Sequence, residues 1–342
     1  MSINSICICG GGSLGLVCAG VFLSKGIKVN ILTGHPGNWC KNIKVIDDKG
    51  KIYEGILNNV SSDPSQVIPS SNLILLTQPG FLIEDTLKKI KPFLNNSAVI
   101  GSIVSSTGFF FFAHEILGTK HPIFGFQRVP FIARQKEYGK IGELLGYKPS
   151  LNVAIENCRN VQEMTKDLEY LFETPINTLN SFYEAALTNS NPILHTGRLY
   201  SLWRNYTDET YDNPILFYKE WTDEASDYLI KMDNEFQKLL LKLGLSKGTI
   251  PTLLDYYEST DASSLTKKIA SIPAFQNILS PMKRTRRGWI PDFSSRYFTE
   301  DFPYGLKFIR DLAQKYNVET PYIDEVYQWG ISKIESNTTG KL

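Results

Sequence analysis

The chain has 342 residues, of which 42% are hydrophobic and 21% charged, and its formal net charge at pH 7 is +1. This length exceeds one ordinary hydrophobic core and predicts two domains, and the composition is that of a folded globular protein. The balanced charge gives no reason to expect nucleic acid or an anionic membrane as a partner. No apolar stretch approaches the ~20 residues that span a bilayer, and the first residues lack signal-peptide features. We therefore expect a cytoplasmic protein.

A glycine-rich turn follows the first apolar strand, Ser5–Cys9, and opens a helical pattern over residues 14–25. The spacing is G-x-G-x-x-G, in which Gly10 allows the tight turn, Gly12 lets the backbone approach a pyrophosphate and Gly15 lets helix pack on strand. The helix N-terminus offers unpaired N–H groups and about half a positive charge to the phosphates. The predicted cofactor-binding residues of this turn are Gly10, Gly12, Ser13, Leu14 and Gly15.

Short apolar strands alternate with helical patterns through the first half of the chain. Strands are predicted at residues 5–9, 28–32, 73–77, 98–102, 123–126 and 152–155, and helices at 14–25, 82–93, 110–117 and 161–172. This alternation predicts a parallel sheet covered by helices on both faces. Residues 43–53, with a polar Asp-Asp-Lys-Gly turn, predict an inserted hairpin.

From about residue 185 helical patterning replaces the strand pattern, and its longest stretch is 217–243, which ends before Gly244. The predicted fold class is therefore α/β, with an N-terminal Rossmann domain built on a doubly wound parallel sheet and an all-helical C-terminal domain. We place the two domains at residues 1–180, for dinucleotide binding, and 181–342, for substrate binding and catalysis.

The five cysteines and four histidines of the chain show no metal-ligand spacing, so we expect no metal site. The cysteines are interpreted as small buried hydrophobic residues in a reducing compartment.

Two strand ends beside the glycine turn bear on the cofactor. An acid after the second strand accepts the ribose diol of NAD, whereas the 2′-phosphate of NADP requires that acid to be absent and a cation nearby. Here Thr33 follows the strand and no acid is present, while His35 or Lys41 offers positive charge, so the sequence favours NADP(H) over NAD(H). The third strand ends at Gln78 and Pro79, which either flank a cofactor ribose or form a simple strand-to-helix turn.

Asn191 and His195 are four residues apart near the start of the second domain, and a helix would place them on one face. Histidine titrates near neutral pH, which suits it to exchange a proton with a substrate oxygen. A lone histidine among apolar residues is also consistent with a purely structural role.

An aromatic-rich segment over residues 288–306 carries several charges among apolar groups. Buried charges require partners. One interpretation is an internal ion pair between Arg296 and an acid. The other is a substrate cleft in which Arg296 binds a carboxylate and Asp301 orients a histidine.

Together these segments resemble the octopine/nopaline (opine) dehydrogenase family. The likeness rests on the glycine turn, on residues 126–134 with the Glu-Tyr-Gly sequence at 137–139, on the Asn191-x-x-x-His195 pair, and on residues 291–301. The first motif is shared by many Rossmann domains, and the last is specific to this family.

The resemblance implies a reaction in which the amine of an amino acid condenses with a 2-oxo acid and NADH or NADPH reduces the imine. It implies that His195 is the acid/base and that Asp301 orients it. It also implies that Arg296 binds a substrate carboxylate and that Asn191 helps to polarise the oxo group. The chain departs from the family pattern at Thr196, where proline is expected, which bears on the shape of this helix start.

The substrates bring two carboxylates, so at least one cation should line the cleft. Arg296 is the first candidate, and the others are Arg128, Arg134 and Arg198.

Two other functions fit parts of the sequence. A ketopantoate-reductase or 3-hydroxyacid-dehydrogenase type of enzyme would keep the fold, but several such reductases use a lysine that is absent from residues 180–204. A non-enzymatic dinucleotide-binding regulator would have no use for residues 296–301. The identity of the amino acid and of the oxo acid is left open, and so is the oligomeric state, for which a homodimer is one option.

Overall fold

The computed structural model of the chain describes residues 3–95, 97–106 and 108–339, and it divides into two units, Met1–Thr188 and Asn189–Leu342. The boundary between the units follows Thr188, whereas the sequence analysis placed it after residue 180.

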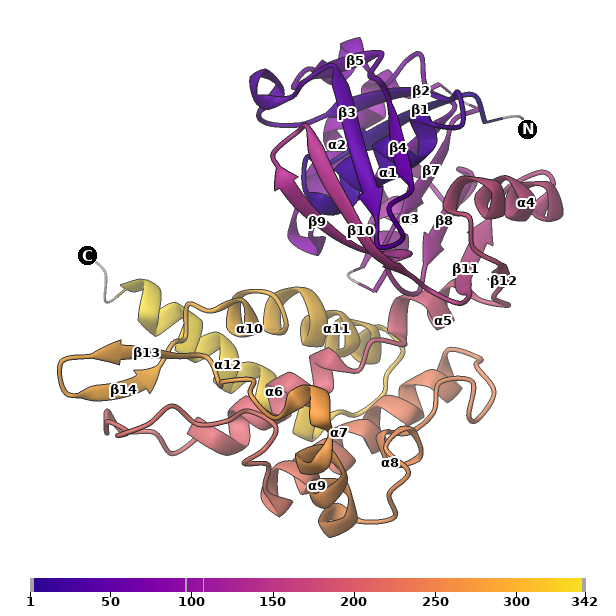
Figure 1. Cartoon of the computed structure of the whole chain (residues 1–342). Coiled ribbons are helices and arrows are strands. Elements are labelled where there is room, and N and C mark those ends of the chain that lie inside the picture. Colours follow the sequence, from indigo (N-terminus) through magenta and orange to yellow (C-terminus); the bar gives the residue numbers. More distant parts are fainter. Residues whose placement is uncertain (1–2, 96, 107, 340–342) are drawn as a thin grey trace. The chain divides into compact units, whose positions relative to one another are not determined.

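An eight-stranded sheet forms the centre of the first unit (Figure 1), in the order β12-β11-β8-β7-β6-β1-β2-β5. Neighbouring strands are parallel except for the antiparallel pair of β8 and β11. Every residue of β1, β6, β7 and β8 is buried, as expected for strands covered on both faces. The strands are β1 (Ser5–Cys9), β2 (Lys28–Leu32), β5 (Asn59–Ser61), β6 (Leu73–Leu76), β7 (Val99–Ser102), β8 (Ile123–Phe126), β11 (Leu151–Glu156) and β12 (Ile176–Thr178).

The strand order reverses between β1 and β6, because the chain runs from β1 outward to β2 and then returns to β6 on the other side. In doubly wound sheets ligands bind at the carboxyl ends of the strands at such a switch point. The predicted Rossmann architecture is confirmed.

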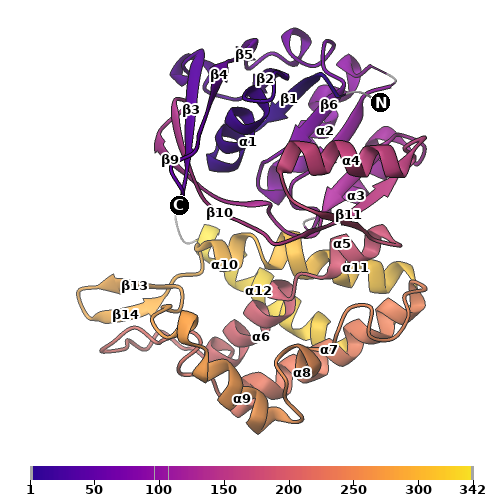
Figure 2. The same ribbon diagram turned by 45° about the vertical axis from the view of Figure 1, so that its right-hand side comes forward.

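Helices cover both faces of this sheet: α1 packs beside α4, and α2 packs beside α3 (Figure 2). All residues from Gly15 to Phe22 of α1 are buried, because a second sheet covers the outer side of this helix. The helices of the unit are α1 (Ser13–Leu23), α2 (Ile83–Ile90), α3 (Phe109–Leu117), α4 (Val161–Phe172) and α5 (Phe182–Leu187).

The second sheet has the order β4-β3-β10-β9 and joins two hairpins that are far apart in sequence. Its strands are β3 (Asn42–Asp47), β4 (Ile52–Ile56), β9 (Phe131–Glu137) and β10 (Ile141–Tyr147). The inserted hairpin predicted at 43–53 is present as β3 and β4, but the sequence analysis missed β9 and β10. Their signal was available: buried Phe131 and Ala133 alternate with exposed Ile132 and Arg134, and Gly139 adopts a positive φ of 63° in the turn.

The second unit is helical, as predicted, with one addition, a hairpin of β13 (Met282–Thr285) and β14 (Gly288–Pro291). Helix α6 lies at its centre, with nine of its residues buried, and it packs against α7 and α12. A Cβ on Gly197 of α6 would lie 2.9 Å from Leu229 Cδ1 of α7, so glycine allows this close approach. The helices are α6 (Asn191–Trp203), α7 (Asp223–Lys242), α8 (Leu253–Tyr256), α9 (Ala262–Ser271), α10 (Arg296–Thr299), α11 (Lys307–Lys315) and α12 (Pro321–Thr339), with a π-helical turn at Phe302–Leu306.

Within the described residues, no helix combines the length and apolar character needed to cross a bilayer.

Candidate functional site

Two glycines of the N-terminal turn are required by the fold itself. Gly10 has a φ of 129°, and a Cβ there would lie 2.6 Å from Thr77 Oγ1. A Cβ on Gly15 would lie 2.2 Å from the carbonyl oxygen of Gly10. Both positions therefore exclude any larger side chain, because the turn closes tightly against β6 and against itself.

Gly12 differs, because a Cβ there would meet no protein atom within 4 Å. Its φ of −82° is also open to other residues, so nothing in the protein itself requires glycine at this position. No side chain caps α1, and the N–H groups of its first turn, which begins at Ser13 and Leu14, remain available to an anion. Open space at Gly12 beside an uncapped helix N-terminus fits a dinucleotide pyrophosphate.

Two hydroxyl groups lie close to Gly11, the residue between Gly10 and Gly12. A Cβ on Gly11 would lie 2.6 Å from Thr33 Oγ1 and 2.8 Å from the hydroxyl oxygen of Tyr138. Gln135 Nε2 donates a hydrogen bond of 3.0 Å to the Gly11 carbonyl. The structure thus brings Thr33 to the glycine turn, as the sequence analysis expected, and adds Gln135 and Tyr138, which it missed.

Gln78 and Pro79 also lie beside the glycine turn. Gln78 Cγ would be 3.0 Å from a Cβ on Gly10, and Gln78 Oε1 accepts a 2.7 Å hydrogen bond from Thr86 Oγ1. Pro79 directly precedes a short 3₁₀ turn, Gly80–Leu82. These residues follow β6 at the switch point, where their positions are compatible both with a cofactor ribose and with a simple strand-to-helix turn.

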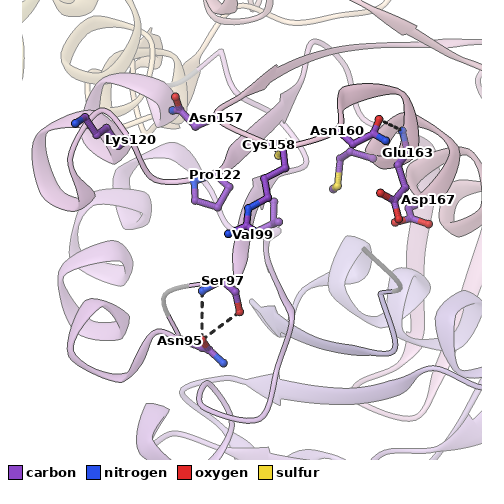
Figure 3. A pocket seen from close by; sticks show the side chains of 12 residues that line it. Asn95, Ser97, Val99, Lys120, Pro122, Asn157, Cys158, Asn160, Glu163 and Asp167 are labelled. Carbon is purple, nitrogen blue, oxygen red and sulfur yellow. Dashed lines mark hydrogen bonds between the residues drawn. The ribbon is translucent and has the colours of Figure 1, made fainter.

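A cavity of about 710 Å³ lies at the amino ends of strands of the same sheet (Figure 3). Val99 at the start of β7, Pro122 before β8, and Cys158 and Asn160 before α4 line it. The amino ends of the parallel strands meet here, whereas the glycine turn lies at their carboxyl ends. This cavity is therefore separate from the cofactor edge.

His195 and Asp301 form a hydrogen-bonded pair within the second unit. His195 Nδ1 lies 2.8 Å from Asp301 Oδ2, and the His195 side chain is 12% exposed. A carboxylate accepts hydrogen bonds, so Nδ1–H is the donor of this pair and Nε2 is left to bond another group. The geometric pairing that the sequence analysis required is present.

Tyr218 occupies the other ring nitrogen, and the sequence analysis did not foresee it. Its hydroxyl oxygen lies 3.0 Å from His195 Nε2. Phe217 meets the imidazole edge to face at 5.6 Å, and Tyr297 covers it at 4.8 Å between ring centroids. Burial raises the pKa of Tyr218 well above its usual value, with Tyr297, Tyr257 and Asp301 adding to the shift, so the phenol is neutral at physiological pH.

Arg198, one of the candidate carboxylate binders, is instead part of the core. It is 1% exposed, and its guanidinium donates to the carbonyl oxygens of Phe217 and Glu220, at 3.0 Å from Nε to Phe217. Its guanidinium also lies over the Trp221 ring at 5.2 Å. Burial lowers its pKa to about 10, which leaves it charged at neutral pH. Arg198 therefore fixes the segment that carries Tyr218.

Arg296 makes the ion pair that was one of its two interpretations. Its Nε and Nη2 donate to the two carboxylate oxygens of Glu300 at 2.7 and 2.9 Å, one helical turn away. The Arg296 side chain is 80% exposed. The guanidinium is thus accessible, but a substrate carboxylate would have to displace or share Glu300.

Asn191 is the first residue of α6 and is exposed, one helical turn before His195. Thr196, where the family pattern suggests proline, is fully buried and its hydroxyl donates to the Pro192 carbonyl. The substitution is therefore accommodated by a hydrogen bond inside the helix.

The described part of the chain contains no group of three or more His, Cys, Asp or Glu side chains arranged to hold a metal ion.

The second unit matches a known family model. Residues 178–333 match the family model of the NAD/NADP octopine/nopaline dehydrogenase alpha-helical domain. An opine dehydrogenase of Haliotis discus hannai is 27% identical over 95% of this chain and 89% of its own length. The octopine dehydrogenase of Pecten maximus is 25% identical, over 96% and 90%. The chain is thus similar to opine dehydrogenases over nearly its whole length.

A solved octopine dehydrogenase with NADH and L-arginine superposes on this opine dehydrogenase homologue with a TM-score of 0.85, at 25% identity, over 97% of this chain and 89% of that one. The predicted resemblance, the fold and the class of NAD(P)-dependent dehydrogenase acting on CH–NH donors are confirmed.

Substitution of Gly12 should affect cofactor binding, whereas substitution of Gly15 should affect the stability of the fold. We expect Gly12→Val to raise the Kd for NAD(P)H by at least ~10²-fold, because the new side chain fills the space open to the pyrophosphate. The melting temperature should stay within about 2 °C of the native value, because no protein atom is displaced. Tryptophan-quenching titration with NADH and NADPH measures the first effect and thermal unfolding the second.

Gly15→Ala is the matched control, because its added methyl group would strike the Gly10 carbonyl. We expect it to lower the melting temperature by several degrees, since overpacking typically costs ~1–3 kcal/mol. Native-like cofactor binding by Gly12→Val would mean that the phosphates bind elsewhere.

Proposed function

We propose that this chain condenses an amino acid with a 2-oxo acid and reduces the imine with NAD(P)H, using His195 and Asp301 as its acid/base pair. The hydrogen bond between these two side chains carries the proposal. It lies in the unit that matches the family's helical domain, and an acid/base histidine needs such an orienting partner.

Asp301 fixes the tautomer of His195 by accepting a hydrogen bond from Nδ1–H, which leaves Nε2 as the ring nitrogen through which a proton can pass toward substrate. The hydroxyl of the carbinolamine leaves as water, and its departure requires a proton that the protonated imidazole supplies. General acid catalysis of this kind contributes typically ~10²–10⁴-fold. Reduced nicotinamide, when bound, supplies the hydride for the imine carbon.

For the cofactor we propose a preference for NADP(H). Thr33 follows β2 where an acid would select the ribose diol of NAD, and its hydroxyl lies beside Gly11 together with that of Tyr138. His35 is two residues further on and donates its backbone N–H to Thr33 Oγ1 at 3.4 Å. Hydroxyl groups and a nearby histidine suit a 2′-phosphate.

For the substrate we propose that Arg296 binds a carboxylate and that Asn191 helps to polarise the oxo group. Arg296 is exposed and presents a planar fork that matches a carboxylate. Glu300 holds this fork in the absence of substrate, so it pre-orients the guanidinium at the price of competing with the substrate.

The function is tested by measuring NAD(P)H consumption with pyruvate or 2-oxoglutarate, with and without a panel of amino acids. We expect consumption to require both partners and to give a secondary amine product detectable by mass spectrometry. Consumption with the oxo acid alone would indicate a simple reductase, and none at all would leave a dinucleotide-binding regulator. Repeating the titration with NADH and NADPH tests the cofactor preference, which equal or reversed affinities would contradict.

Replacing the acid/base should remove turnover without loosening the cofactor. We expect His195→Ala to lower kcat by at least ~10²-fold and to leave the Kd for NAD(P)H within about twofold. His114→Ala is the matched control, because His114 Nε2 also pairs with a carboxylate, Glu156, at 2.7 Å, but in the first unit. Near-native kcat in His195→Ala would remove this residue from the mechanism.

Removing the carboxylate binder should act on the substrate alone. We expect Arg296→Ala to raise the KM of the 2-oxo acid by about 10- to 100-fold, the worth of a charge-assisted bidentate pair, with little change in cofactor affinity. Glu300→Gln should leave this KM unchanged or lower it, because the competing carboxylate is gone. Equal losses of cofactor and substrate affinity in Arg296→Ala would indicate a folding role.

A further inference from the structure

Both nitrogens of the proposed acid/base are already hydrogen-bonded inside the second unit. His195 Nδ1 is hydrogen-bonded to Asp301 Oδ2 at 2.8 Å, and His195 Nε2 is hydrogen-bonded to the hydroxyl oxygen of Tyr218 at 3.0 Å. A ring nitrogen makes one linear hydrogen bond in the plane of the ring. A substrate oxygen therefore has no direct route to Nε2 while Tyr218 stays in place.

Tyr218 is held firmly in place. Its ring stacks on Phe275 at 4.4 Å and lies parallel to Trp221 at 6.1 Å between centroids, and it is 7% exposed. The buried guanidinium of Arg198 holds the carbonyl before it, of Phe217, and a second one after it, of Glu220. Moving the Tyr218 ring would break this packing, and moving the backbone that carries it would leave a buried cation without its acceptors, which is costly.

From this geometry we infer that Tyr218 is a catalytic residue: its phenol carries the proton between His195 and the substrate, as the last member of a chain Asp301–His195–Tyr218. The inference rests on the proposed function of His195. It adds a residue that neither the sequence motifs nor the pairing with Asp301 indicated.

The donors and acceptors of the chain fit this role in both protonation states. When the imidazole is neutral, the phenol O–H donates to Nε2. When the imidazole is protonated, Nε2–H donates to the phenol oxygen, and none of the described residues then accepts a hydrogen bond from the phenol. That proton is free to be donated to a substrate oxygen.

The proton transfer balances in one concerted step. As the C–O bond of the carbinolamine breaks, the phenol passes its proton to the departing oxygen, and Nε2–H passes its proton to the phenol oxygen. The nitrogen lone pair forms the C=N bond. The products are water, a protonated imine, a neutral imidazole and an unchanged phenol. Burial keeps the pKa of Tyr218 well above its usual value, which disfavours a phenolate and requires the two transfers to occur together.

The competing explanation is that Tyr218 stands in for the substrate oxygen and is displaced when substrate binds. The two explanations predict opposite effects of removing the hydroxyl. A relay loses its last member in Tyr218→Phe, whereas a displaced phenol would free Nε2 and leave turnover unchanged or faster.

We expect Tyr218→Phe to lower kcat about 10²-fold, with the KM of both substrates and the Kd of NAD(P)H within about twofold. Tyr200→Phe is the matched control: Tyr200 lies on the same helix as His195, is also 7% exposed, and its hydroxyl bonds Glu325 rather than the histidine. It should keep native kcat. Native or higher kcat in Tyr218→Phe would overturn the relay.

A second experiment keeps the hydroxyl and so does not depend on the phenylalanine variant folding. Fluorinated tyrosines placed at position 218 preserve the ring and its hydrogen bond but make the phenol more acidic. If the phenol passes the proton, single-turnover imine formation should change systematically across the series. A rate independent of phenol acidity would overturn the relay.

Nitrogen NMR of the histidine side chains tests the bond without using activity, which is practicable because the chain has four histidines. We expect the Nε2 resonance of His195 to move in Tyr218→Phe and to stay fixed in Tyr200→Phe. An unmoved resonance would show that the bond is absent in solution and overturn the relay. Failure of the proposed function has a different signature, a native chain that makes no secondary amine from any pair of substrates.

Discussion

The hydrogen bond between His195 and Asp301 is the constraint on which the proposed chemistry of the second unit depends. It joins α6 to the segment after α10 across 106 residues of sequence. The packing of the surrounding helices also positions each of the two side chains. His195 sits on a helix whose other faces are buried, and Asp301 precedes the π-helical turn Phe302–Leu306, which packs against the same helix. The core therefore aligns the pair, because neither segment can shift without disturbing the packing of α6.

Arg198 shows how a buried charge can serve a neighbouring site without touching substrate. By its type it was a candidate for carboxylate binding, yet its guanidinium is turned inward to two backbone carbonyls. A buried guanidinium needs acceptors, and here they are the backbone carbonyls of Phe217 and Glu220, on either side of Tyr218. The arginine thus adds two hydrogen bonds to the segment that carries Tyr218.

In the first unit the glycine turn separates two requirements that the sequence motif combines. At Gly10 and Gly15 an added Cβ would strike neighbouring protein atoms, whereas at Gly12 it would meet no protein atom within 4 Å. The second sheet supports this turn through Gln135 and places the hydroxyl of Tyr138 beside Gly11. An insertion that looks peripheral in the strand order therefore contributes directly to the surface on which we propose that the dinucleotide binds.

The sequence by itself determined the elements whose signal is local. Apolar runs buried on both faces predicted β1, β2 and β8 with their observed bounds. Glycine spacing predicted the turn before α1, and residues 291–301 with Asn191 and His195 indicated the resemblance to opine dehydrogenases. Tertiary structure decided whatever depends on partners distant in sequence. It selected Glu300 as the partner of Arg296, turned Arg198 into the core, paired β3 with β10, and brought Tyr218 to Nε2 of His195. Periodicity reports which face of an element is buried, but a hydrogen bond between side chains depends on how those faces meet, and only the folded chain specifies that.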